Sequence, residues 1–206
     1  MTRRTSSANA PRPQPRAPRA FLYVEGPRDR EIIEGWAQRS SRQLAACVRE
    51  STVILGGRQP ARAAQHLAEA RAEAAETRGL CVLDCDGEET LPLVPASAGL
   101  ELFVWSRRHI ESYLLVPAAL RRVLRDADPR AIRALAEELP EPADEQGWRA
   151  LDAKRRLASN GQRFPWGRAA RALRDEELHG DVRAFLARLA TLFDVAISPH
   201  VVRRTP

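Results

Sequence analysis

The chain has 206 residues, of which 44% are hydrophobic and 29% are charged, and its net charge is +6. No apolar run reaches the roughly 18–20 residues that a membrane-spanning helix needs, and the basic start lacks the apolar stretch of a secretory signal. Three cysteines without zinc-like spacing are typical of reduced thiols in a cytosolic protein. These totals predict a soluble cytoplasmic protein with no membrane partner.

Residues 1–20 stand apart by composition. They are rich in proline, serine, alanine and arginine and contain no acid, so the arginines of this segment account for most of the net charge. Such a segment has little to bury, and it predicts a disordered basic arm. The arm is either an inert tail or a source of nonspecific attraction to phosphates.

Residues 21–117 alternate between strand and helix patterns. Short apolar runs predict four strands, at residues 21–24, 52–55, 80–83 and 100–105. Helical patterns fill residues 28–39 and 60–77. Strands that alternate with helices favour a parallel sheet with helices on both faces. We therefore predict an α/β domain over residues 21–117, with a mostly parallel four-stranded sheet.

The remainder of the chain is helical in composition. Ser106 suits the N-cap of a helix at residues 107–115. Further helices are predicted at residues 117–125, 129–139, 144–157, 165–174 and 181–193, joined by short linkers. We predict that residues 118–206 form a helical extension that packs on the sheet domain and is not an independent domain.

Acidic residues follow the predicted strands. Glu25 follows the first strand, and Asp84 and Asp86 end the third, where positions i and i+2 share one side. The carboxyl edge of an open α/β sheet is where ligands bind. Asp29 and Glu111 lie on adjoining helices, although Asp29 also suits an ordinary first-turn acid. Neighbouring carboxylates repel unless a cation separates them, which predicts a Mg²⁺ (or Mn²⁺) site.

Four segments in this order resemble the successive motifs of a TOPRIM domain, in its OLD-like branch. They are residues 24–29 (Val-Glu-Gly-Pro-Arg-Asp), 54–57 (Ile-Leu-Gly-Gly), 82–87 (Val-Leu-Asp-Cys-Asp-Gly) and 105–115, which carries arginines and then a glutamate. This catalytic fold is shared by topoisomerases, bacterial primases and the OLD-family nucleases, and standalone relatives act in bacterial and phage-defence systems. The resemblance implies a TOPRIM-like (Rossmann-like) fold.

The resemblance also implies roles for individual residues. Glu25 matches the invariant glutamate, as a metal ligand or as a general base that orients water. Lys154, the only lysine of the chain, is the candidate for the lysine of the helical part. If that position matches residues 164–168 instead, the lysine is missing and a weakened enzyme is implied. The implied metal ligands are Asp29, Asp84, Asp86 and Glu111.

Three arginines are candidate phosphate clamps: Arg58, Arg107 and Arg108. Solvated helix faces explain them at least as well. His109 is interpreted as structural, because it lies two positions before Glu111 and residues i and i+2 of a helix do not share a face. Trp36, Trp105 and Tyr113 are interpreted as core aromatics.

These observations lead to a metal-dependent nuclease as the first hypothesis, with DNA favoured over RNA as its partner and phage defence as its setting. The alternative is a non-catalytic or partner-gated TOPRIM module that binds nucleic acid, a nucleotide or a regulatory protein. A third reading is a receiver-like domain that gathers acids around Mg²⁺. It ranks last, because Lys154 lies deep in the helical region and not near a late strand end.

Overall fold

The structure is a computed structural model that describes residues 20–85, 97–125, 129–137, 139–158 and 164–197. The predicted basic arm therefore lies outside the described residues, except for its last residue. Asp86 also lies outside them. Within the described part of the chain, no helix has the length and apolarity needed to cross a membrane.

Four strands form one parallel sheet, as predicted. In chain order they are β1 (Ala20–Val24), β2 (Thr52–Ile54), β3 (Arg78–Leu83) and β4 (Leu100–Val104), and their order in the sheet is β2-β1-β3-β4. All three pairings are parallel. The carboxyl ends of all four strands therefore lie at one edge of the sheet, with β1 and β3 side by side at its centre.

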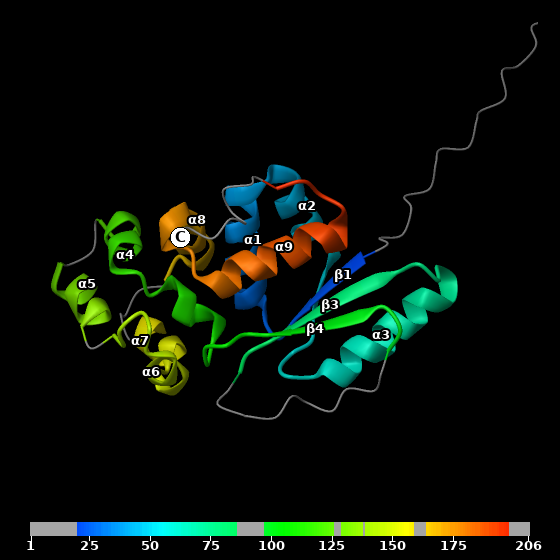
Figure 1. Ribbon diagram of the computed structural model, residues 1–206, viewed down its shortest axis with the longest axis horizontal. Coiled ribbons are helices and arrows are strands. Elements are labelled where there is room, and N and C mark those ends of the chain that lie inside the picture. Colours follow the sequence, from blue (N-terminus) through cyan, green and yellow to red (C-terminus); the bar gives the residue numbers. More distant parts are fainter. Residues whose placement is uncertain (1–19, 86–96, 126–128, 138, 159–163, 198–206) are drawn as a thin grey trace, which may run out of the picture.

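Helices cover both faces of this sheet. Figure 1 shows α1 (Pro27–Ser40), α2 (Arg42–Ser51) and α9 (Gly180–Phe193) on one side and α3 (Pro60–Glu73) on the other. Alternate residues of β3 serve the two faces, since Leu80 and Val82 enter the larger core and Cys81 and Leu83 the smaller one. The larger core includes the predicted aromatics Trp36, Trp105 and Tyr113.

Apart from α9, which covers the sheet, the helices of the extension lie beyond the carboxyl edge of the sheet (Figure 1). The short 3-10 helix η1 (Ile110–Leu114) leads to them, and they are α4 (Pro117–Val123), α5 (Pro129–Ala136), α6 (Glu145–Ala150), α7 (Ala153–Ala158), α8 (Trp166–Ala172) and η2 (Asp175–Glu177). Helix α8 packs along α1 so closely that a Cβ on Gly35 would lie 2.4 Å from the Gly167 carbonyl oxygen. The division into 21–117 and 118–206 stays a prediction.

Two predicted helices differ from the structure, and one observed helix was not predicted. The helix expected at 107–115 is only the short 3-10 helix η1, because the Ser106 N–H and hydroxyl donate to the Asp181 carboxylate of α9 and do not cap a helix. The helix expected at 144–157 is divided into α6 and α7 by the extended Leu151. Helix α2 was not predicted, although its buried residues Leu44, Ala45 and Val48 have helical spacing.

Candidate functional site

The tips of β1, β2 and β3 are joined by hydrogen bonds. The Asp84 N–H donates to Glu25 Oε1 at 2.8 Å. The Glu25 carbonyl oxygen accepts from the N–H groups of Gly56 at 3.0 Å and Gly57 at 2.9 Å. Both glycines have positive φ, +80° and +127°, which glycine adopts without strain. This turn brings Arg58 back to donate to the Asp84 carbonyl oxygen, so the predicted clamp supports the backbone of the site.

The carboxylate of Asp84 is buried and has a partner on each oxygen. Its side chain is only 4% exposed. Oδ1 accepts from the Ile110 N–H at 2.9 Å, which fixes the start of η1. Oδ2 lies 2.6 Å from Lys154 Nζ. Helix α7, which packs against η1, thus brings the only lysine of the chain to the tip of β3.

Glu111 is more deeply buried than Asp84 and has fewer hydrogen-bond partners. Its side chain is 0% exposed; Oε1 accepts from Arg28 Nη1 at 3.1 Å. Its other oxygen, Oε2, has no hydrogen-bond partner among the described residues. Burial, followed by repulsion from Asp84, raises the pKa of Glu111 despite the opposing effects of Lys154 and Arg28. Part of its negative charge is therefore uncompensated.

Asp29 has a structural bond and a perturbed pKa. Its Oδ2 accepts from the Gly26 N–H at 2.8 Å, at the start of α1, so the ordinary first-turn role is present. Burial and the nearby Asp84 raise the pKa of Asp29 to about 7. Burial alone would lower the pKa of Lys154, but the carboxylates of Asp84, Glu111 and Asp29 outweigh it and the net shift is upward. The four groups therefore form one interacting set.

Three of these groups, Asp29, Glu111 and Lys154, line an open pocket of about 620 Å³ at the carboxyl edge of the sheet. It is lined by Glu25, Gly26, Pro27, Arg28, Asp29, Glu31, Gly57, Glu111, Lys154 and Trp166. A second pocket, of about 710 Å³, lies by Arg78 at the amino end of β3 and by the end of α9. Ionisable side chains converge at the first pocket, which makes it the candidate site.

The side chains present suit a divalent cation in chemical type. Asp29, Asp84 and Glu111 offer only carboxylate oxygens, which Mg²⁺ prefers, and the buried Glu111 Oε2 is unsatisfied. In the described ranges, however, no three His, Cys, Asp or Glu side chains are grouped closely enough to hold a metal. The positive charge beside Asp84 and Glu111 is supplied by Lys154 and Arg28 instead of a metal. Asp86, the remaining predicted ligand, lies outside the described residues.

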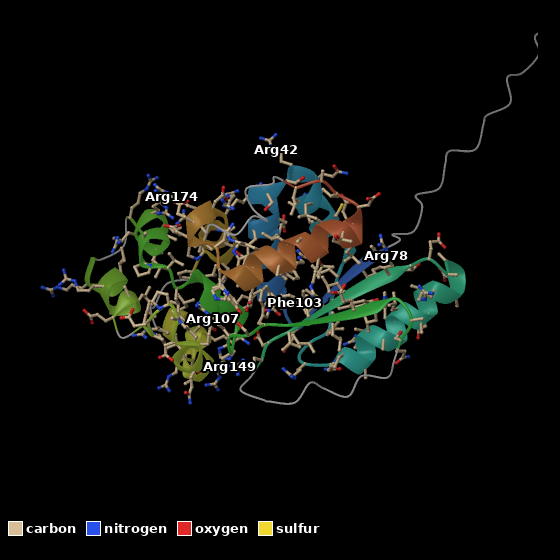
Figure 2. The ribbon with its side chains drawn as sticks, viewed as in Figure 1. Arg42, Arg78, Phe103, Arg107, Arg149 and Arg174 are labelled. Carbon is tan, nitrogen blue, oxygen red and sulfur yellow. The ribbon has the colours of Figure 1, made fainter. Side chains whose placement is uncertain are left out.

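The structure does not bring two of the predicted clamps into the pocket. Arg107 is 7% exposed, and its guanidinium lies 3.9 Å from the ring centre of Trp148 and 5.2 Å from that of Tyr113. Figure 2 shows it in the interior, where the end of β4 meets the helical extension. Arg108 Nη1 lies 3.4 Å from the Ala150 carbonyl oxygen. Both arginines hold the extension together in this structure.

The site also includes side chains that the sequence analysis did not select as functional residues. Arg28 contacts Glu111 and lies 4.5 Å from the ring centre of Trp166. Arg28 lies within the first motif, so the sequence could have indicated it as a site residue. Trp166 belongs to α8, far along the chain, and no motif indicated it. His109 is buried beside the set, and burial followed by the charge of Lys154 lowers its pKa.

No protein-family model matches the sequence, and no curated protein matches it. Among solved structures, the C-terminal region of the Burkholderia pseudomallei OLD protein matches with a TM-score of 0.51 and 16% identity, over 84% of this chain and 97% of that chain. The C-terminal region of the Xanthomonas campestris pv. campestris OLD protein has a TM-score of 0.46 and 15% identity, over 85% and 96%. The first likeness shows that this chain has an OLD-like TOPRIM fold.

Proposed function

We propose that the protein is a metal-dependent nuclease that hydrolyses phosphodiester bonds of nucleic acid, DNA in preference to RNA, with Mg²⁺ or Mn²⁺. Asp29, Asp84 and Glu111 would hold the metal together with Asp86. Glu25 would act as a further ligand or as the general base, and Lys154 would act on the phosphate. A role in phage defence belongs to the same proposal, since it follows from the resemblance of the motifs.

One observation carries this proposal. Lys154 lies 70 positions after Asp84 in the sequence, yet its ammonium contacts the carboxylate of Asp84 at the tip of the central strand. Glu111, from a third segment, is buried beside them with a raised pKa. Burying several charges together is costly for stability, and perturbed groups of this kind cluster at functional sites. The OLD-like fold supports the same conclusion.

The chemistry follows from the residue types. A bound divalent metal would polarise the phosphate and generate a hydroxide nucleophile near neutral pH. Lys154, which is 38% exposed at the pocket, can place its ammonium against the negative charge that develops on the phosphate. Glu25 accepts a hydrogen bond from the backbone of Asp84, so these two residues fix the tips of β1 and β3 relative to each other. Such preorganisation is what catalysis on a phosphodiester requires.

A partner-gated or non-catalytic module is the second candidate. It is favoured by the two contacts in which Lys154 and Arg28 already neutralise Asp84 and Glu111. A site whose acids are paired with its own cations could await a regulatory protein or a nucleic acid before it acts. The receiver-like reading is less well supported, because both Asp84 oxygens are occupied and the side chain is too buried to accept a phosphoryl group.

The test is strand cleavage of plasmid, linear DNA and structured RNA by the purified protein, with Mg²⁺, with Mn²⁺ and with a chelator. Asp84→Asn keeps an acceptor for the Ile110 N–H but removes the charge. Glu101→Gln is the matched control, because it removes one exposed acid from β4, near the opposite edge of the sheet. Metal-dependent cutting that only Asp84→Asn abolishes is the expected result. Equal cutting by both variants contradicts the proposal.

A further inference from the structure

We propose that Arg28 is an exchangeable counter-charge: it neutralises Glu111 in the metal-free protein and moves to a phosphate of the nucleic acid when a metal binds. This inference rests on the proposed function, and it deepens that function by coupling the two ligands of the site. Its consequence is that metal and nucleic acid each strengthen the binding of the other.

The unequal exposure of the two partners is the first step. Glu111 is 0% exposed, whereas the Arg28 side chain is 41% exposed at the pocket. Arg28 occupies Oε1 only, and Oε2 has no hydrogen-bond partner among the described residues. A buried carboxylate with one open oxygen still favours an additional cation. Arg28 can leave toward solvent and Glu111 cannot, so the arginine is the partner that exchanges.

Trp166 makes a second contact with Arg28, which is present together with the contact to Glu111. The guanidinium carbon lies 4.5 Å from the centre of the Trp166 ring, which is a cation–π contact that does not depend on Glu111. Trp166 packs against Phe164, with ring centres 4.6 Å apart, and belongs to α8, which is packed along α1. Arg28 can therefore turn away from Glu111 and still be held at the pocket. Its planar donors then suit the bidentate recognition of a phosphate.

Charge explains the coupling. A divalent cation that approaches Glu111 meets the positive charge of Arg28, 3.1 Å from Oε1, so metal binding alone is opposed. A phosphate at the pocket attracts Arg28 and releases Glu111. Thermodynamic linkage then requires the metal to raise the affinity for nucleic acid by the same factor. Arg28 thus has two roles: it binds the nucleic-acid phosphate directly, and it controls the access of the metal to Glu111.

The experiment is calorimetric titration of Mg²⁺, repeated with Mn²⁺, into the full chain without nucleic acid. Arg28→Gln is compared with Arg30→Gln, which makes the same charge change on the same helix at a residue that does not line the pocket. We expect Arg28→Gln to bind metal at least about fivefold more tightly than the wild type, and Arg30→Gln to match the wild type. Unchanged or weaker binding by Arg28→Gln overturns the proposal.

A second arm measures the binding of a 20-base-pair DNA duplex with and without Ca²⁺. The wild type should bind more tightly with Ca²⁺, Arg28→Gln should lose this enhancement, and Arg28→Lys should restore part of it. Trp166→Leu should weaken duplex binding without tightening the binding of Mg²⁺, which separates the loss of the Trp166 contact from the loss of the Arg28 charge. Duplex binding by Arg28→Gln that still responds fully to Ca²⁺ contradicts the coupling.

The two proposals fail in different ways. Cleavage by the wild type, with metal affinity that Arg28→Gln does not increase, leaves the nuclease standing and removes the role of Arg28. Tighter metal binding by Arg28→Gln, in a protein that cuts nothing, supports the exchange and removes the nuclease. No metal binding by any variant removes both.

Discussion

Two acidic sites contact the segment from Ser106 to Tyr113, and their acids differ in how they are stabilised. The Asp181 carboxylate accepts from the Ser106 N–H at 3.2 Å, the Ser106 hydroxyl and the Tyr113 hydroxyl at 2.5 Å. Burial alone would raise the pKa of Asp181, but these hydrogen bonds outweigh it and the pKa is lowered. In the candidate site, by contrast, the pKa values of Asp29 and Glu111 are raised.

The direction of the pKa shift separates an acid whose charged form the fold stabilises from one whose charged form it disfavours. Asp181 ties α9 to the segment between β4 and η1, and its environment favours the charged form. The environment of Glu111 disfavours the charged form. A charged Glu111 at this position therefore lowers the free energy of unfolding of the protein. Residues that reduce stability in this way are expected where ligands act.

The largest expected effect is on catalysis. Lys154→Gln should lower the cleavage rate by about 10²-fold or more, since in the proposed nuclease it removes the charge that acts on the reacting phosphate. Arg155→Gln changes the next residue of α7, which is exposed, and should leave the rate within about twofold. Initial rates under saturating Mg²⁺ measure both. Similar rates for the two variants would place Lys154 outside the catalytic machinery.

The next effect is on stability. Asp181→Asn should lower the free energy of unfolding by about 2 kcal/mol, because the neutral amide oxygen that replaces Oδ2 accepts the hydrogen bonds of Ser106 and Tyr113 more weakly than the charged carboxylate does. Urea unfolding followed by circular dichroism gives this value. Glu101→Gln, which breaks an exposed ion pair with Arg188, should change it by less than about 0.5 kcal/mol. A loss no larger in Asp181→Asn than in this control would mean that the hydrogen bonds are not stabilising.

The pH dependence of stability should follow the same acid. The pKa of Asp181 is lower in the folded protein than the usual value near 3.9, so the folded state binds fewer protons. Its stabilising contribution is present above about pH 4 and is lost as the pH falls through the folded pKa. The difference between wild type and Asp181→Asn should therefore shrink as the urea unfolding series is extended into acid. A constant difference contradicts the assignment.

The smallest effect has the opposite sign. Glu111→Gln should raise the free energy of unfolding of the metal-free protein by up to about 1 kcal/mol, since it removes a buried charge while Gln can still accept from Arg28. For a chain of this size this corresponds to about 2–4 °C in Tm. Differential scanning calorimetry in a chelator is the measurement. A Tm that falls as far as that of Asp181→Asn would mean that both acids are structural.

Much of the fold could be predicted from the sequence because its signals are local. Apolar runs that alternate with helical patterns predicted four parallel strands, and the strand tips predicted where acids such as Glu25 and Asp84 would meet. The helix after Ser106 was predicted wrongly, since a serine can cap a helix or donate to a distant carboxylate. Only the position of Asp181, 75 residues later, decides between the two.

The contacts of the site itself were harder to predict. Lys154 was proposed from a family resemblance, but its contact with Asp84 depends on the break at Leu151 between α6 and α7, where the composition indicates one helix. The Arg28–Trp166 contact depends on how α8 packs along α1. Such packing joins segments more than 100 residues apart, and no periodicity within either segment records it.

The most direct test of the central claim, that Glu111 belongs to a metal centre, is the effect of Mg²⁺ on the Tm of the wild type and of Glu111→Gln. A ligand at one hundred times its Kd stabilises the folded state by about 2.7 kcal/mol, or about 5–10 °C for a chain of this length. We expect Mg²⁺ to raise the Tm of the wild type and to leave that of Glu111→Gln nearly unchanged. An equal rise in both proteins, or none in the wild type, would contradict the claim.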